Sequence, residues 1–241
     1  MKKRIALFIL SCFTLLTFAT PSTSKVPIYN FDGGWLKEDN KIIIRCDIFQ
    51  FPQADSYKKK INEIMMTEFR ESISFAKNQK TPEYFKPEIR ARSKVYINNS
   101  KLFSAWNKVY CSYYNIFPKA YVKDQTVNLQ ILPNGDVKEI KIEELFDKNS
   151  DWQTALLLKG VELLKKQKFE FWDNAKIENE IKNREEKWEF YFYSFVITNR
   201  NSIVLIYQSL SLAPNVAGYP SVEIPLSELP NYNGYLDNLM K

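Results

Sequence analysis

The chain has 241 residues, with 34 basic and 28 acidic side chains, three cysteines and no histidine. Without histidine, the sequence excludes Ser–His and Cys–His nucleophilic pairs, histidine-ligated zinc and histidine proton relays. The net charge of +6 is spread over interleaved Lys and Glu residues. Nucleic-acid binding usually needs a concentrated basic face, so we expect no nucleic-acid partner.

The N-terminal residues have the pattern of a secretory signal peptide. Three basic residues at 2–4 precede an apolar run over 5–19, which is shorter than the roughly 20 residues of a membrane-spanning helix. We therefore expect a signal peptide at 1–19, an exposed lead-in at 20–37, and a periplasmic or secreted mature chain of net charge +3. An uncleaved membrane anchor and lipoprotein-type cleavage at Cys12 are the alternatives. We expect no membrane span beyond this segment.

Hydrophobic periodicity and turn residues in the first half predict a strand, a long helix and two hairpins. Apolar residues recur every four positions along the helix, and the strands alternate. Gly135 follows Pro133 and Asn134 in the second hairpin turn, where we expect it to have a positive φ. The predicted elements are a strand at 41–51, a helix at 56–78, and strands at 88–98, 101–117, 120–132 and 136–142.

The second half begins with helices and returns to strands. Ser150 or Asp151 is expected to cap the first helix, because both side chains can accept a hydrogen bond from the first turn. The predicted elements are helices at 151–168 and 175–187, and strands at 188–198, 202–208 and 221–224. This order favours an α+β fold with mixed or antiparallel sheets, a long N-terminal helix and a mid-chain helical segment.

Two aromatic groups are candidates for ligand binding. Trp106, Tyr110 and Tyr114 lie on one predicted strand, and residues 188–195 contain a denser cluster. Exposed Trp and Tyr rings can stack on sugars, but aromatic residues on both faces of a strand are also typical of a sheet covered on both sides. We therefore expect these aromatic side chains to pack in the hydrophobic core. Exposed rings would instead indicate a ligand-binding surface.

Acidic pairs are the remaining catalytic candidates. Glu143-Glu144 follows a predicted strand and Glu185-Glu186 lies on a polar helix. Neighbouring residues diverge on both kinds of element, whereas acid–base catalysis needs two carboxylates in one cleft. The sequence has neither a phosphate-binding glycine loop nor a nucleophile elbow, so we expect no catalytic residue, no cofactor and no metal site.

Two cysteines remain after removal of the signal peptide. Cys46 and Cys111 lie in apolar, strand-like runs. In an oxidising compartment they can form a disulfide, and they can equally remain free as buried thiols. The spacing of the two residues does not distinguish these alternatives, because the geometry of the folded chain decides them.

The last third carries the most specific pattern. The residues that form it are Tyr207, Ala213, Pro214, Ala217, Gly218, Val222, Ile224 and Pro225. This pattern resembles the C-terminal part of the RsiV/PdaC-like extracellular domains, in which a strand pair leads into an APYxxG turn and a V-x-IPY strand. Asn215 and Leu226 stand where the family commonly has Tyr. The resemblance implies an N-terminal half at 38–146, a C-terminal half at 147–232 and a tail at 233–241.

The resemblance implies an extracytoplasmic module without catalysis of its own. In the anti-sigma factor RsiV this module is a lysozyme receptor, and in PdaC-type enzymes it accompanies a polysaccharide deacetylase domain. We therefore expect an exported, non-catalytic binding module at the cell envelope that acts on a cell-wall-related partner such as peptidoglycan. The alternatives are a soluble lysozyme-binding or lysozyme-inhibiting protein and a carboxylate-only hydrolase.

Overall fold

The computed structural model describes residues 42–52, 56–171, 173, 176–208, 211–212 and 219–240. The expected signal peptide and lead-in lie outside the described residues. The same is true of four residues of the family-like pattern, namely Ala213, Pro214, Ala217 and Gly218.

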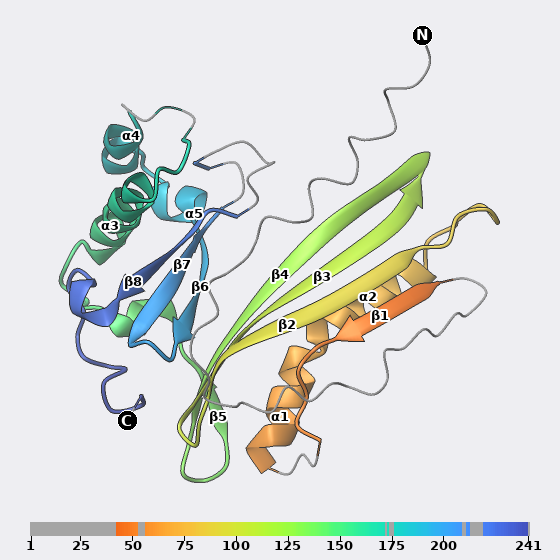
Figure 1. Ribbon diagram of the computed structural model, residues 1–241, viewed down its shortest axis with the longest axis horizontal. Helices are drawn as coiled ribbons and strands as arrows, with labels where there is room; N and C mark the ends of the chain where they lie inside the picture. The colour runs from red at the N-terminus through yellow and green to blue at the C-terminus, as the bar shows by residue number, and fades with distance from the viewer. Residues whose placement is uncertain are drawn as a thin grey trace.

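The first half of the chain forms a five-stranded sheet in which the strands follow one another in sequence order (Figure 1). Its strands are β1 (Ile43–Asp47), β2 (Glu88–Asn98), β3 (Leu102–Asn115), β4 (Phe117–Ile131) and β5 (Val137–Glu139). The edge strand β1 pairs with β2 in parallel, and the remaining pairs are antiparallel. The sheet is therefore mixed, as the sequence predicted.

Both predicted hairpin turns are present. Asn99 closes the turn between β2 and β3, since its side-chain oxygen accepts hydrogen bonds from the backbone N–H groups of Lys101 and Leu102. Gly135 has a φ of 78° in the turn between β4 and β5, which confirms the positive φ expected there.

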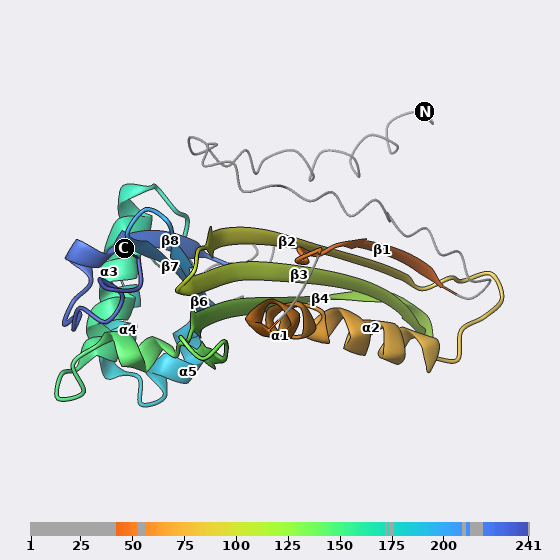
Figure 2. The same ribbon diagram turned by 90° about the horizontal axis from the view of Figure 1, so that it is seen from below.

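Two helices, α1 (Ser56–Met65) and α2 (Thr67–Lys77), cover one face of this sheet (Figure 2). Ile61, Met65 and Phe69 point from them into a core shared with β2, β3 and β4. The prediction of one continuous helix over 56–78 was wrong at a single point, because the helix is interrupted at Met66.

The second half forms an antiparallel sheet in the order β6-β7-β8, with helices packed against it. Its elements are α3 (Trp152–Lys166), α4 (Ile177–Asn183), α5 (Lys187–Tyr191), β6 (Phe192–Thr198), β7 (Ser202–Tyr207) and β8 (Ser221–Pro225). Two short 3-10 turns lie at Ile142–Leu145 and Leu226–Glu228. Asp151 caps α3 by accepting a hydrogen bond from the backbone N–H of Thr154, which confirms one of the two predicted caps.

The strand predicted at 188–198 begins four residues later than expected. Lys187–Tyr191 is helical, which buries Tyr191 completely and stacks the Trp188 ring on Phe192 at a centroid distance of 4.1 Å. The aromatic run at 188–195 therefore begins in the short helix α5 and continues into β6. Beyond β8, Leu236 is fully buried, so the expected C-terminal tail packs against the core of the second half.

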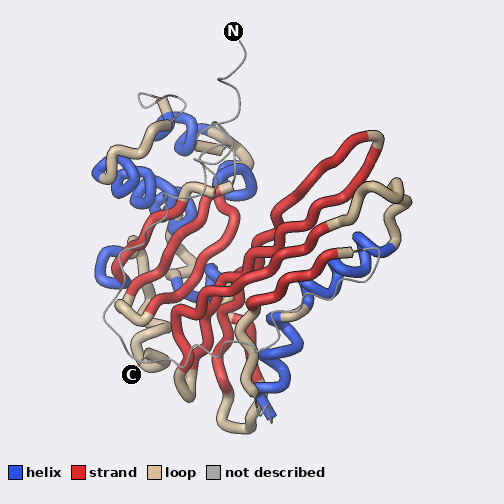
Figure 3. The backbone as a smooth tube through the Cα atoms, turned by 45° about the vertical axis from the view of Figure 1, so that its right-hand side comes forward, coloured by secondary structure: helices blue, strands red, loops and turns tan. Residues whose placement is uncertain are grey.

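The two sheets meet where the edge strand β6 lies across β2, β3 and β4 (Figure 3). The backbone N–H of Ile197 donates to the side chains of Ser104 and Asn128, and the amide of Asn128 donates to the carbonyl of Phe195. The sheets lie side by side at this end and diverge at the other, as Figure 1 shows. The architecture is α+β, as expected.

Candidate binding surface

The five-stranded sheet has one face that the helices do not cover. Successive residues of a strand point to opposite faces, so Ala105, Val109 and Cys111 face the helical core, while their neighbours Trp106 and Tyr110 belong to neither core. Nine residues in register occupy this side of the sheet, and we call them the open sheet face. They are Arg90, Arg92 and Lys94 on β2, Trp106, Lys108 and Tyr110 on β3, and Val122, Asp124 and Thr126 on β4.

Basic and aromatic side chains dominate the open sheet face. Four of the nine residues are Lys or Arg, and the three on β2 are exposed. The ammonium of Lys108 lies next to the Trp106 ring, and Arg90 lies opposite Tyr110 at 5.9 Å from its ring centroid. Each aromatic ring therefore has a cation beside it.

Asp124 lies at the centre of this surface and orients two of its neighbours. Its side chain is fully buried, and one carboxylate oxygen accepts a 2.7 Å hydrogen bond from the indole N–H of Trp106. The ammonium of Lys108 lies 3.6 Å from the same oxygen and 4.4 Å from the centroid of the Trp106 ring. The carboxylate thus orients both a ring and a cation of the open sheet face.

The other oxygen of Asp124 is buried and has no hydrogen-bond partner among the residues that the structure describes. Burial raises the pKa of this carboxyl, and the attraction of Lys108 and the bond from Trp106 offset part of the rise. Asp124 is therefore a desolvated acid with one unused acceptor position.

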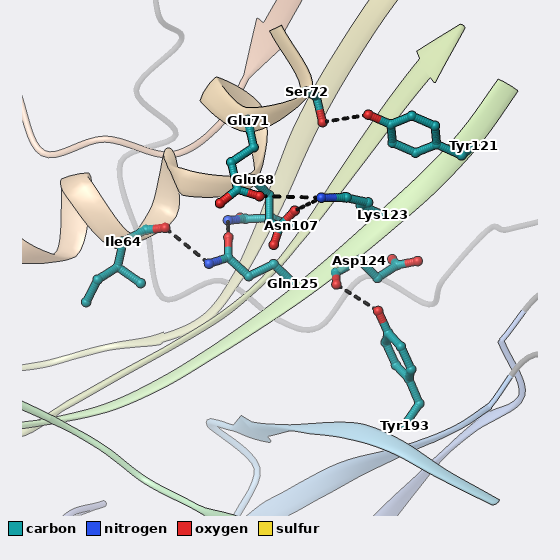
Figure 4. A network of polar contacts seen from close by, with 10 residues as sticks. All are labelled: Ile64, Glu68, Glu71, Ser72, Asn107, Tyr121, Lys123, Asp124, Gln125 and Tyr193. Atoms are coloured by element: carbon teal, nitrogen blue, oxygen red, sulfur yellow. Dashed lines mark hydrogen bonds and ion pairs between the residues drawn. The ribbon is translucent and has the colours of Figure 1, made fainter. Parts of the chain in front are cut away.

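Two tyrosines connect Asp124 to the second sheet. The hydroxyl of Tyr193 on β6 donates a 2.8 Å hydrogen bond to the backbone carbonyl of Asp124 (Figure 4). The Tyr193 ring lies 4.7 Å from that of Tyr219, and burial raises the pKa of both phenols.

The opposite side of the same strands has a structural role. Lys123 and Gln125 point toward α1 and α2, away from the side to which Tyr193 binds (Figure 4). Asn107 donates to Gln125 and to the carbonyl of Met65, both at 3.0 Å, and Gln125 donates to the carbonyl of Ile64 at 3.1 Å. These bonds stabilise the chain at the break between α1 and α2, so the polar residues on this side have a structural role.

Several residues singled out in the sequence lie in the core. Tyr207 is fully buried, and its hydroxyl donates to the carbonyl of Leu157 at 2.8 Å. Val222 and Ile224 are buried on β8, which Pro225 ends. Tyr207, Val222 and Ile224 of the family-like pattern therefore belong to the core between the second sheet and α3.

Cys46 and Cys111 are free thiols. They lie on β1 and β3 with β2 between them, and Cys46 pairs with Ala91 while Cys111 pairs with Ile89, so their Cα atoms are more than two strand spacings, or roughly 10 Å, apart. A disulfide needs a Cα separation below about 7 Å. Burial raises the pKa of both thiols.

The acidic pairs do not form a site. Glu143 is exposed, Glu144 binds Lys138 and the backbone N–H of Lys141, and Glu185 and Glu186 are exposed. Within the described part of the chain, no three His, Cys, Asp or Glu residues gather as a metal ion would require. Its helices are also too short or too polar to cross a membrane.

The sequence alone identified Trp106 and Tyr110 as candidates for ligand binding, but it gave no reason to select Lys108 or Asp124. A lysine and an aspartate in alternating strands look like ordinary solvent-facing residues. Their significance depends on the register that places Lys108 opposite Asp124, and no local pattern encodes that register.

Comparison with known proteins finds a sequence similarity over part of the chain and a similar fold over most of it. Residues 143–227 match a family described as "Protein of unknown function (DUF3298)", and no curated protein matches the sequence. A DUF3298 family protein from Pseudomonas aeruginosa PAO1 shares 14% identity at a TM-score of 0.50, over 79% of this chain and 84% of that one. A DUF3298 member from Bacteroides fragilis NCTC 9343 shares 15% identity at a TM-score of 0.42, over 76% and 68%. The chain is therefore similar to DUF3298 proteins in sequence over residues 143–227, and to the Pseudomonas protein in fold.

Proposed function

We propose that this protein is an exported, non-catalytic binding module whose open sheet face holds an anionic glycan of the cell wall. The observation that supports this best is the Trp106 ring, partly buried on the sheet, bonded to Asp124 and next to the ammonium of Lys108. Trp106 and Tyr110 are only partly exposed and belong to neither hydrophobic core, which supports a surface role over the core role favoured from the sequence. The signal-like N-terminus supports export, and the resemblance to RsiV/PdaC-like domains supports a cell-wall partner.

The chemistry of the open sheet face suits a sugar that carries carboxylates. An aromatic ring offers its apolar face to the C–H groups of a pyranose, while Arg and Lys bind carboxylate oxygens. Peptidoglycan presents both features, because its pyranose strands carry stem peptides with free carboxylates. The bond from Trp106 to Asp124 fixes the ring before the ligand arrives, which lowers the entropy lost on binding.

A positioning role for Asp124 supports binding rather than hydrolysis. Glycoside hydrolysis generally uses two carboxyl groups about 5–9.5 Å apart on opposite sides of the bond. Asp124 is the one acidic residue among the nine of the open sheet face, and it is already bonded to Trp106 and beside Lys108. Glu88, which precedes these residues on β2 and lies on the same side, is paired with Arg90. The charge of this face also favours an acidic glycan over a lysozyme, because lysozymes are often strongly basic.

The test is calorimetric titration of the protein with soluble peptidoglycan fragments. Trp106→Ala is expected to weaken binding by roughly tenfold or more, because it removes the ring and frees Lys108 and Asp124. Asp124→Asn keeps an acceptor for the indole N–H but loses the attraction to Lys108, so we expect a smaller loss. Phe190→Ala is the matched control, since it removes a partly exposed ring on α5, outside the open sheet face.

Two outcomes would contradict the proposal. One is an unchanged affinity of Trp106→Ala for the fragments. The other is that the wild-type protein does not bind the fragments but does bind a lysozyme, which would favour the lysozyme-binding alternative. Titration with a lysozyme under the same conditions therefore belongs to the same experiment.

A further inference from the structure

The distal end of the five-stranded sheet lies away from the second sheet (Figure 1), and it exposes large apolar side chains. Ile116, in the turn between β3 and β4, is 85% exposed, and Phe117, the first residue of β4, is 57% exposed. Tyr84, 79% exposed, lies beside them on the segment between α2 and β2, with its hydroxyl 3.0 Å from that of Tyr114. We call residues 77–87 and 113–119 together the distal tip.

The turn at the distal tip contains a residue with an unfavourable backbone conformation. Asn115 pairs with Phe117 across the turn, which leaves Ile116 alone at its apex with a φ of 64°. A β-branched residue rarely adopts this conformation, and Gly or Asn would fit the position with less strain. Strain of this kind is typical of positions kept for function.

The charge of the distal tip is basic. It contains Lys77, Lys80, Lys86 and Lys119 against one acidic residue, Glu83. The ammonium of Lys119 lies 4.7 Å from the centroid of the Phe117 ring, so a cation and an apolar ring protrude together. Aromatic and aliphatic side chains flanked by lysines are the composition that anchors proteins at the interface of a bilayer.

We propose that the distal tip docks onto an anionic lipid bilayer, with Ile116, Phe117 and Tyr84 in the interfacial region and the lysines among the headgroups. A bilayer accommodates a protruding apolar wedge without a preformed pocket, and its anionic headgroups attract each nearby lysine. Tyr114, which contacts Tyr84 and lies 5.5 Å from the Phe85 ring, supports the apolar residues from behind. This docking is independent of glycan binding, because the distal tip shares no residue with the open sheet face.

The test compares vesicles of equal parts phosphatidylcholine and phosphatidylglycerol with vesicles of phosphatidylcholine alone. The full chain is used, and hydrogen exchange identifies which segments the lipid protects, since the apolar run at 5–19 can bind lipid by itself. We expect protection of residues 113–119 and of the Tyr84 segment with the anionic vesicles, decreasing as salt is added.

The double variant Ile116→Ser with Phe117→Ser is expected to lose this protection and to need roughly tenfold more lipid for the same tip occupancy. Phe190→Ser is the matched control and should behave as the wild type. Circular dichroism checks that both variants fold. Serine at position 116 must adopt the same positive φ as isoleucine. A loss of protection in this variant therefore reports on the removal of apolar atoms and not on a change of the backbone.

Three results would overturn the proposal. The distal tip could exchange at the same rate with and without anionic vesicles. Neutral vesicles could protect it equally well, which would remove the role of the lysines. Protection that needs no lipid and rises with protein concentration would show instead that the tip contacts a second copy of the chain.

Discussion

Asp124 combines full burial with one unused acceptor, so its ionisation opposes folding. Its pKa is raised in the folded protein above the unfolded value of 3.8, mainly because burial removes the carboxylate from water. Between these two values the folded state binds more protons than the unfolded state, and the free energy of unfolding falls as pH rises. The stabilising effect of the protonated form is therefore present at acid pH and is lost as pH rises through the raised pKa.

Asp124→Asn should remove this pH dependence. The amide keeps an oxygen for the indole N–H of Trp106 and needs no desolvation of charge, so we expect the free energy of unfolding at neutral pH to rise by up to about 2 kcal/mol. Urea unfolding at several pH values measures the change.

Asp136→Asn is the control for this variant. Asp136 is an exposed carboxylate whose pKa Lys60 lowers through a hydrogen bond, so its contribution has the opposite sign and is lost as pH falls. A loss of stability in Asp124→Asn at neutral pH would mean that the carboxylate is net favourable in the fold.

At the scale of elements, α3 packs against β7 at one close contact. A Cβ atom on Gly160 would lie 2.1 Å from the hydroxyl oxygen of Tyr207 and 3.0 Å from a methyl carbon of Leu205. Alanine is otherwise favoured over glycine inside a helix by about 1 kcal/mol. The glycine is therefore required by packing.

Gly160→Ala should lower the free energy of unfolding by about 2–3 kcal/mol, against its helix propensity. Tyr207→Phe should cost about 1 kcal/mol, because it removes the hydrogen bond to the Leu157 carbonyl. The double variant should lose less than the sum of the two, since removal of the hydroxyl clears the nearest clash. Thermal unfolding of the four proteins measures the coupling, and strict additivity would contradict this account of the contact.

Local patterns predicted most elements of the fold, and the failures share a cause. The turn at Gly135 and the cap at Asp151 were predictable because each depends on residues within a few positions. The interruption at Met66 was not, because the bonds that hold it come from Asn107 and Gln125, about 40 and 60 residues away (Figure 4). Apolar periodicity continues through Met66 and gives no local signal.

The same limit applied to the candidate site. Aromatic residues on β3 could be named from the sequence, but whether they faced a core or solvent depended on what covered each side of the sheet. Helices α1 and α2 cover one side, and β6 covers part of the other. The remaining uncovered part, which contains Lys108 and the exposed basic residues of β2, follows from the packing of the two halves.

At the scale of the whole molecule, the joint between the two sheets is polar and buried. Strand β6 has a free edge, and an exposed edge invites pairing with another chain. Side chains of the first sheet satisfy this edge instead: Ser104 and Asn128 bond to the backbone of Ile197, and Asn128 also bonds to Phe195. Since each half thereby completes hydrogen bonds of the other, we expect the halves to unfold together.

Asn128→Ala tests this joint. It leaves the buried carbonyl of Phe195 without its amide donor and weakens the contacts of Ile197, so we expect a loss of about 2–4 kcal/mol. Hydrogen exchange in urea should show the same fall in stability for peptides of both halves. Gln130→Ala, which removes a half-buried bond to Tyr235, should cost less than about 1 kcal/mol. A fall confined to one half would show that the two sheets unfold independently and that the joint only docks them.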